Sequence, residues 1–162
     1  MQATTIVQSP VGPLFLAVEA GSVVELSFHR HSRQATASGA GADTDLLRHV
    51  DAQLREYFAG ERTEFELPLE LRGPEFHKRV WKALLGIPYG ETISYGALAQ
   101  RVGSPAHARA VGAANGANPI AIVVPCHRVI GADGTLVGYG GGLRRKQMLL
   151  DLESKRLTLA LN

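Results

Sequence analysis

Residues 94–115 read SYGALAQRVGSPAHARAVGAAN, and this stretch decides the fold of the second half of the chain. Apolar residues at helical spacing predict a short helix around Tyr95–Val102, with Ser94 as its N-terminal cap. Gly103-Ser104-Pro105 interrupts the pattern, and Ser104 is the expected cap of a second helix over Ala106–Asn115. Two short helices joined by a tight turn are typical of a helix-turn-helix motif, although many helical hairpins share this pattern and bind nothing.

The second of these helices consists almost entirely of small residues, and Arg109 is its only permanent cation. Small side chains let a backbone approach another helix closely, and taken alone the pattern favours helix packing. They also let a helix approach the sugar-phosphate wall of a groove. An arginine that stands out of such a helix can contact phosphate, or fill the gap left when a base leaves the stack.

Charge is divided unequally about Gly73. Residues 1–73 carry six arginines and ten carboxylates, a net charge of −4, whereas residues 74–162 carry eleven basic and five acidic side chains, a net charge of +6. A basic half beside an acidic half favours a polyanion as partner of the basic half, although chance composition produces the same asymmetry. We expect two domains, 1–73 and 74–162.

The first half predicts a small α+β domain. Its short apolar segments, separated by turn residues, indicate an antiparallel sheet with strands at Thr4–Gln8, Leu14–Glu19 and Val23–Phe28. A surface loop is expected over Arg30–Ala42. A helix with an apolar face follows, capped by Asp43 or Thr44 and ended by Gly60.

Two further helices are expected in the second half, one from Pro74 to Gly86 and one over Leu143–Glu153. The last carries Arg144, Arg145 and Lys146 in its first turn, where cations oppose the helix dipole, so an anion such as phosphate would account for them. No apolar run reaches the ~18 residues that a bilayer span needs. The N-terminus shows no secretory pattern, which makes a cytoplasmic location the expectation.

Cys126 is the only cysteine among the 162 residues, which excludes an internal disulfide, a multi-cysteine zinc site and a CxxC redox pair. The apolar run from Asn118 to Pro125 predicts a short, buried, strand-like segment before it. A lone buried cysteine is most often a small hydrophobic residue. The adjacent His127 and Arg128 can depress the pKa of a thiol, which favours a nucleophile. These residues alone leave both interpretations open.

A glycine-rich stretch, Gly138-Tyr139-Gly140-Gly141-Gly142, follows downstream. It is either a flexible connector or a loop whose amides approach a nucleobase, and it lacks the GK[ST] ending of a phosphate-binding loop.

The segment Pro125-Cys126-His127-Arg128-Val129, with Asn118-Pro119 upstream, resembles the signature of the O6-alkylguanine-DNA alkyltransferases, also called methylated-DNA–protein-cysteine methyltransferases. Further blocks resemble family motifs in order and spacing: residues 87–92, 94–95, 108–112 and 138–142. The resemblance covers about residues 74–153 strongly, whereas the first half matches the family's layout more than its motifs.

The resemblance implies an α+β fold: a ribonuclease H-like scaffold domain, then a mostly helical, winged-helix-like domain with the helix-turn-helix and the acceptor cysteine. It implies DNA repair by direct damage reversal. The alkyl group of O6-alkylguanine in double-stranded DNA would pass irreversibly to the protein's own cysteine after base flipping, with O4-alkylthymine open as a second substrate. Each molecule would act once, as a monomer without cofactor or metal, with cooperative assembly on DNA left open.

The family pattern also assigns roles to residues. Cys126 would be the alkyl acceptor, His127 its base through a water molecule, and Glu153 the carboxylate that orients His127. Tyr95 would protonate the departing guanine, and Arg109 would fill the gap in the duplex. The DNA contacts fall on Tyr95, Ala108, Arg109, Ala110, Gly112 and Arg128. The base pocket falls on Val124, Val129, Tyr139 and Gly140, and Asn118 would tie the helix-turn-helix to the cysteine segment.

Two other classes of protein are alternatives to this interpretation. Alkyltransferase-like proteins flag alkylated bases without repair, but they lack the acceptor cysteine that stands here at position 126. A sequence-specific regulator would read base edges with Arg, Asn or Gln, and Ala106–Asn115 offers mainly Arg109 and Asn115. Two departures from the family are visible: a single cysteine excludes the structural zinc of some members, and Gly140 stands where serine is common.

Overall fold

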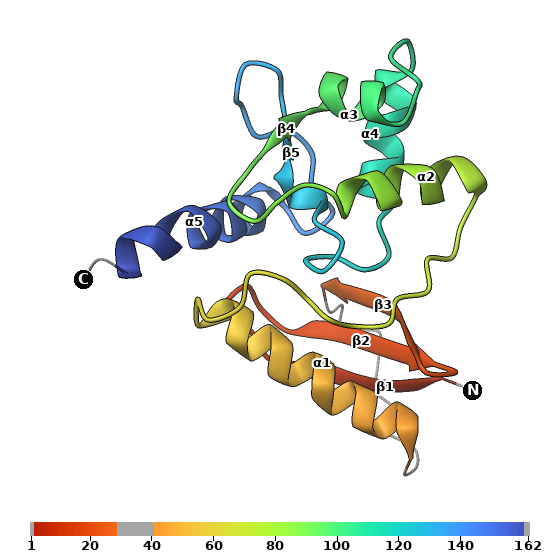
Figure 1. Ribbon diagram of the computed structural model, residues 1–162, viewed down its shortest axis with the longest axis vertical. Coiled ribbons are helices and arrows are strands. Elements are labelled where there is room, and N and C mark those ends of the chain that lie inside the picture. The colour runs from red at the N-terminus through yellow and green to blue at the C-terminus, as the bar shows by residue number, and fades with distance from the viewer. Residues whose placement is uncertain (1, 29–40, 161–162) are drawn as a thin grey trace. The chain divides into compact units, whose positions relative to one another are not determined.

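The computed structural model describes residues 2–28 and 41–160, with side chains described as far as Ser154. The chain consists of two compact units, Met1–Leu71 and Arg72–Asn162. The first holds a small antiparallel sheet and a helix, and the second is mostly helical (Figure 1). The α+β fold expected from the sequence is therefore confirmed.

Three strands form the sheet of the first unit in the order β1 (Ala3–Val7), β2 (Leu14–Glu19), β3 (Ser22–Phe28), all antiparallel. β2 is central and five of its six residues are buried, so it is covered on both faces. The turn between β2 and β3 is Ala20-Gly21, whose φ angles of 51° and 84° suit a two-residue hairpin and match the twist of the strands. All three predicted strands are confirmed.

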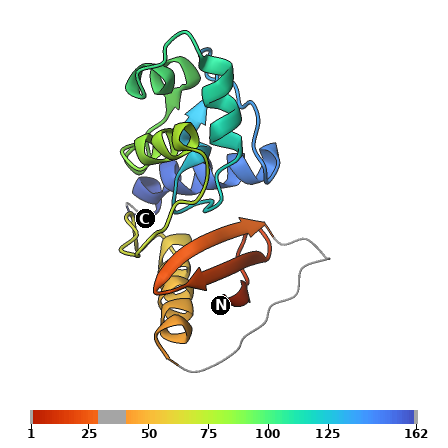
Figure 2. The same cartoon turned by 90° about the vertical axis from the view of Figure 1, so that its right-hand side faces the viewer.

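α1 (Ala42–Phe58) packs across the sheet, as two perpendicular views show (Figures 1 and 2). The expected caps are wrong: the N-cap is Gly41, and no side chain caps the helix. The Asp43 carboxylate instead accepts the amide hydrogen of Gly21 at 2.9 Å, which joins the helix start to the β2–β3 turn. Of the predicted loop Arg30–Ala42, residues 30–40 lie outside the described residues and Ala42 is already helical.

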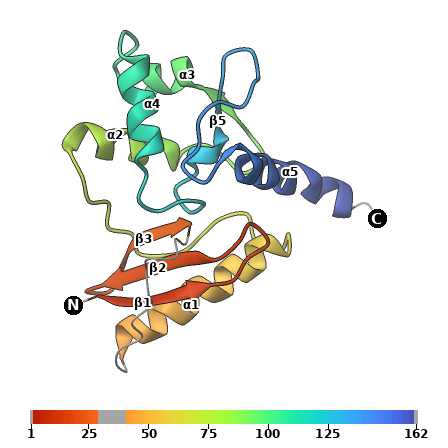
Figure 3. The same cartoon turned by 180° about the vertical axis from the view of Figure 1, so that it is seen from behind.

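The second unit contains α2 (Glu75–Leu84), α3 (Tyr95–Arg101), α4 (Ala108–Gly116) and α5 (Leu143–Ala160). α2, α3 and α4 pack against one another (Figure 3), and the indole nitrogen of Trp81 on α2 donates to the carbonyl of Ala114 on α4 at 2.8 Å. Two short parallel strands, β4 (Ile93–Ser94) and β5 (Val129–Ile130), join α3 to the segment after Cys126.

The helix boundaries confirm one predicted cap and correct another. Ser94 caps α3, since its hydroxyl accepts the amide hydrogen of Ala97 at 3.0 Å. α4 begins at Ala108 with His107 as N-cap, two residues later than expected. The amide of His107 donates to the carbonyl of Ser104, which closes a turn over Pro105 and delays the helix. Pro74 likewise precedes α2 as its N-cap.

The strand expected over residues 118–125 is wrong. The segment is buried from Ile120 onward but forms turns, with φ of 72° at Ile122. The side chain of Asn118 replaces the bonds of a ladder: its Nδ2 donates to the carbonyl of Val124 at 2.7 Å, and its Oδ1 accepts from the amide of Ile120 at 3.0 Å. Among the described residues, no helix is long and apolar enough to cross a membrane.

Candidate active site

Cys126 opens a short 3-10 helix, η1 (Cys126–Arg128), which Pro125 precedes and β5 follows. α5 packs against η1, and Glu153 of α5 contacts His127 of this segment. Cys126 is 5% exposed, and its amide donates to the carbonyl of Val124 at 2.8 Å. The thiol is therefore held at a fixed place in the interior.

Burial raises the pKa of the Cys126 thiol to about 11, although a hydrogen bond from Asn118 and the charge of Lys146 oppose the rise. The expectation that its cationic neighbours depress this pKa is wrong for the structure as it stands. Arg128 is engaged elsewhere, and the cation that favours the thiolate is Lys146, from α5. The thiol is protonated at neutral pH, so it becomes a nucleophile only when a base removes its proton.

His127 and Glu153 form a buried pair, with 2.7 Å between Nε2 and Oε2. Burial lowers the pKa of His127 although Glu153 opposes it, so the imidazole is neutral at pH 7. Because an ionised carboxylate only accepts hydrogen bonds, Nε2 carries the proton and Nδ1 is left with a lone pair. Nδ1 is buried and has no hydrogen-bond partner. The arrangement is that of a base oriented by a carboxylate.

Glu153 also binds Arg128. Burial raises the pKa of the Glu153 carboxyl, but hydrogen bonds and charge from His127 and Arg128 outweigh it and bring the pKa to about 2. Arg128 Nε and Nη2 lie 2.8 and 3.1 Å from the two carboxylate oxygens, and Nη1 donates to the carbonyl of Ile87. The DNA contact expected of Arg128 is therefore wrong, because its guanidinium lies in the interior and is bound there.

Lys146 is fully buried, which corrects the expectation that it faces phosphate. Its ammonium donates to the carbonyls of Val137 and Gly138 at 3.0 and 3.2 Å and lies 5.8 Å from the centre of the Tyr95 ring. Burial lowers the pKa of Lys146. The first turn of α5 thus holds the glycine-rich loop against the cysteine site. Lys146 lies one turn into an amphipathic helix. That position could have indicated from the sequence that its side chain is buried, but the sequence analysis did not use it.

Tyr95 begins α3, and its hydroxyl donates to the carbonyl of Val137 at 2.8 Å. Burial raises the pKa of Tyr95, and Asn115 opposes this through a hydrogen bond. A Cβ atom at Gly112 would lie 3.7 Å from the Cδ1 and Cε1 atoms of the Tyr95 ring. The tyrosine therefore lies between α4 and the loop that leads to Gly138.

The expected pocket residues differ in burial. Val124 and Val129 are fully buried beside Cys126, and burial raises the pKa of Tyr139 far above its usual value. Gly140 lies near the end of α4, where an added Cβ would be 3.9 Å from the carbonyl of Gly116. Among the described residues, no group of three or more His, Cys, Asp and Glu side chains is placed to hold a metal ion.

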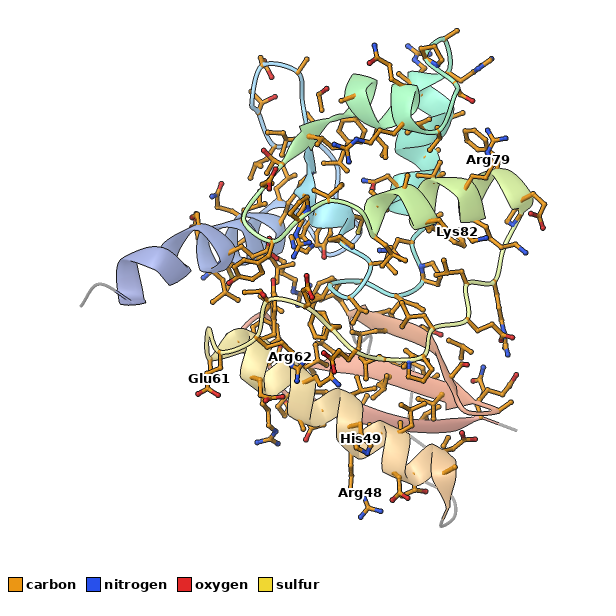
Figure 4. The ribbon with its side chains drawn as sticks, in the orientation of Figure 1. Arg48, His49, Glu61, Arg62, Arg79 and Lys82 are labelled. Atoms are coloured by element: carbon orange, nitrogen blue, oxygen red, sulfur yellow. The ribbon has the colours of Figure 1, made fainter. Side chains whose placement is uncertain are left out.

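The first turn of α4 is exposed at Ala108, Arg109 and Ala110, three of the expected DNA-contacting residues, whereas Gly112 adjoins Tyr95. On α2, whose exposed Arg79 and Lys82 are labelled in Figure 4, Arg79 donates to the carbonyl of Val102 at the end of α3. Arg109 on α4 is thus exposed, while other residues of α4 pack against α2 and α3.

Two family models match the chain. The DNA binding domain of 6-O-methylguanine DNA methyltransferase matches residues 75–155, and the ribonuclease-like domain of the same family matches residues 3–71. The methylated-DNA–protein-cysteine methyltransferase of Mycobacterium tuberculosis is 53% identical over 150 residues, which cover 93% of this chain and 91% of that protein. That of Methanosarcina acetivorans is 46% identical over 149 residues, 91% of this chain and 96% of its own length.

Solved structures agree. The crystal structure of Mycobacterium tuberculosis O6-methylguanine methyltransferase superposes with a TM-score of 0.84 at 51% identity and covers 99% of both chains. The Mycobacterium tuberculosis OGT structure in complex with DNA has a TM-score of 0.82 at 51% identity, over 96% of this chain and 93% of that one. The chain therefore belongs to the methylated-DNA–protein-cysteine methyltransferase family, enzymes of DNA repair that transfer an alkyl group to a protein cysteine.

Proposed function

We propose that this protein repairs O6-alkylguanine in double-stranded DNA by taking the alkyl group onto Sγ of Cys126, once per molecule, after the damaged base is flipped out of the helix. The observation that carries the proposal is a neutral His127, next in sequence to the buried Cys126, whose Nδ1 has no hydrogen-bond partner while its Nε2 is held by Glu153. This is the arrangement that a protonated thiol needs.

The reaction begins with removal of the thiol proton. His127 Nδ1 takes it through a water molecule, and Glu153 stabilises the imidazolium that forms. Sγ then attacks the alkyl carbon, the bond from carbon to guanine O6 breaks, and its electron pair stays with the base. The Tyr95 hydroxyl supplies a proton to the departing guanine, and Tyr95 regains a proton through solvent as the His127 imidazolium releases the one taken from the thiol. The product is a thioether, which thiol exchange does not reverse, so the protein acts in a single turnover.

Access to O6 requires base flipping, because the atom is out of reach inside the base stack. The exposed side of α4 supports this step: Ala108 and Ala110 let the second helix of a helix-turn-helix approach a groove, and Arg109 is free to enter the gap that the base leaves. Val124, Val129, Tyr139 and Gly140 would line the base pocket, and Asn118 would hold the segment that leads to Cys126.

Intact-protein mass spectrometry tests the proposal. After incubation with a duplex containing one O6-methylguanine, we expect each molecule to gain one methyl group on Cys126 and then to stop reacting. Cys126→Ala should gain none and still bind the duplex. Sustained turnover, or an unchanged mass of the wild type, would refute the proposal. The same measurement on O4-methylthymine decides whether that base is a second substrate.

Glu153→Gln separates chemistry from DNA binding. Loss of the carboxylate leaves the imidazolium of His127 without its partner, and we expect methyl transfer to slow by about 100-fold while DNA affinity stays within about twofold. Asp151→Asn on the same helix is the matched control, since Asp151 bonds Gln147 and not the site. Equal losses of rate in both variants would contradict the role given to Glu153.

Arg109→Ala should instead weaken DNA binding while the thiol itself stays reactive. We expect weaker binding and slower transfer in duplex DNA, but unchanged reaction of Cys126 with iodoacetamide, because the small reagent needs no flipped base. Arg48→Ala, which removes an exposed arginine from α1, controls for the change in net charge. If the two variants bind DNA equally well, Arg109 does not contact it.

A further inference from the structure

Asn115 is the only polar side chain of α4 that is buried, at 3% exposure. Its amide nitrogen donates to the carbonyl of Cys126 at 3.3 Å, whereas its carbonyl oxygen has no hydrogen-bond partner. An unpaired buried polar atom costs about 1–3 kcal/mol. An apolar residue of the same shape would pack here without this cost. The presence of an amide at position 115 is therefore explained by the groups that it contacts and not by packing.

The same face of α4 lies along Tyr95. Gly112 stands three residues before Asn115, so both point to one side of the helix, and Gly112 adjoins the tyrosine ring. With Gly112 against the ring, Asn115 lies on the side of α4 that faces Tyr95, and hydrogen bonding by its amide opposes the rise that burial causes in the pKa of Tyr95. The titratable groups that also face Tyr95 are Lys146 from α5 and the Cys126 thiol from η1.

The Asn115 amide therefore connects α4 to two other parts of the unit. It belongs to α4, it bonds the backbone of the acceptor residue, and it faces a hydroxyl whose own hydrogen is directed to the carbonyl of Val137. The exposed Arg109 lies on the same helix.

We propose that Asn115 is a positioning residue, which couples α4 to alkyl transfer by holding the Cys126 carbonyl and the Tyr95 hydroxyl in place. The inference rests on the proposed function, because it assigns Tyr95 and Cys126 to the reaction. Asn115 acts through these two groups and not on the alkyl carbon. Its loss should therefore slow the chemical step and leave DNA binding and the intrinsic reactivity of the thiol unchanged.

Asn115→Leu tests this, since leucine keeps the volume and removes the amide. Single-turnover methyl transfer is measured at increasing concentrations of a duplex with one O6-methylguanine. We expect the maximum rate to fall at least about tenfold, with the half-saturating DNA concentration within about twofold. Alkylation of Cys126 by iodoacetamide should stay within about twofold. If the leucine variant does not fold, Asn115→Ala gives the same readouts.

Trp81→Phe is the matched structural control, because it removes another buried hydrogen bond to α4, at the neighbouring Ala114. We expect it to lower stability about as much as Asn115→Leu and to keep the maximum rate within about threefold. If both variants lose rate in proportion to stability, Asn115 is merely structural and the inference is overturned.

A double-mutant cycle with Tyr95→Phe supplies the second readout. If Asn115 acts partly through the Tyr95 hydroxyl, Asn115→Leu should cost at least about threefold less in the Tyr95→Phe background than in the wild type. Full additivity would overturn the inference, as would an Asn115→Leu rate equal to that of the wild type. A wild-type protein that gains no methyl group refutes the proposed function instead, so the two failures are distinguishable.

Discussion

The two units of the chain differ in whether their polar and charged side chains are exposed or buried. In the first unit, Thr4 is the only buried polar residue among those described, and pairs such as Arg48–Asp45 are exposed; Figure 4 shows Arg48 extending from α1. Among the described residues of the second unit, five polar ones are buried: Asn115, His127, Arg128, Lys146 and Glu153. Asn115 bonds the carbonyl of Cys126, the charge of Lys146 lowers the pKa of its thiol, and His127 and Arg128 both bond Glu153. Burial of charge is expensive, and this unit concentrates it where a nucleophile has to be controlled.

The largest difference is expected between two arginine variants of identical chemistry. Arg128→Leu leaves the Glu153 carboxylate buried without its bidentate partner, and we expect a loss of about 3–5 kcal/mol in the free energy of unfolding. Arg48→Leu breaks an exposed pair and should cost less than about 1 kcal/mol. Urea denaturation measures both. Costs within about 1 kcal/mol of one another would remove the contrast between the units.

A smaller effect is expected from the buried lysine. Lys146→Met removes the cation that opposes the high pKa of the Cys126 thiol, so the thiolate fraction at a given pH should fall. We expect alkylation by iodoacetamide at pH 8 to slow about tenfold, equivalent to about 1.4 kcal/mol. Lys82→Met on α2 is the control, since Lys82 is exposed (Figure 4). Equal rates in both variants would show that the Lys146 charge does not reach the thiol.

The last contrast concerns acid pH. The pKa of His127 is lowered in the folded protein, so the unfolded chain binds a proton more readily below pH 6.5. Stability should therefore fall as the pH drops below about 6.5, by at most about 1.4 kcal/mol per pH unit for this one proton. Glu153, with its pKa of about 2 against 4.5, adds a loss as the pH falls below 4.5 toward 2.

Urea denaturation at pH 7, 6 and 5 measures the slope, and His127→Gln should flatten it. His49→Gln, the same substitution at an exposed position of α1, serves as the matched control. A steeper dependence in His127→Gln than in the wild type would contradict a neutral, buried His127.

The sequence predicted the elements whose cause is local. The hairpin at Ala20-Gly21, the cap at Ser94 and the apolar face of α1 follow from the conformations and spacing of neighbouring residues. Predictions failed where a distant partner decided the outcome. Gly41 and not Asp43 caps α1 because the Asp43 carboxylate is engaged by Gly21, 22 residues away. The segment after Asn118 forms turns because that side chain replaces the bonds of a ladder.

The sequence by itself determined the family resemblance, the identity of the lone cysteine, and the approximate positions of the strands and helices, because these depend on residue type and short-range order. Only the tertiary structure decided what the charged residues near Cys126 do. Arg128, which was expected to contact DNA, binds Glu153, 25 residues away in the sequence. Lys146, which was expected to face an anion such as phosphate, binds the carbonyls of Val137 and Gly138, so both side chains are internal supports. The strength of such pairs depends on burial, and burial arises only when the whole unit is packed.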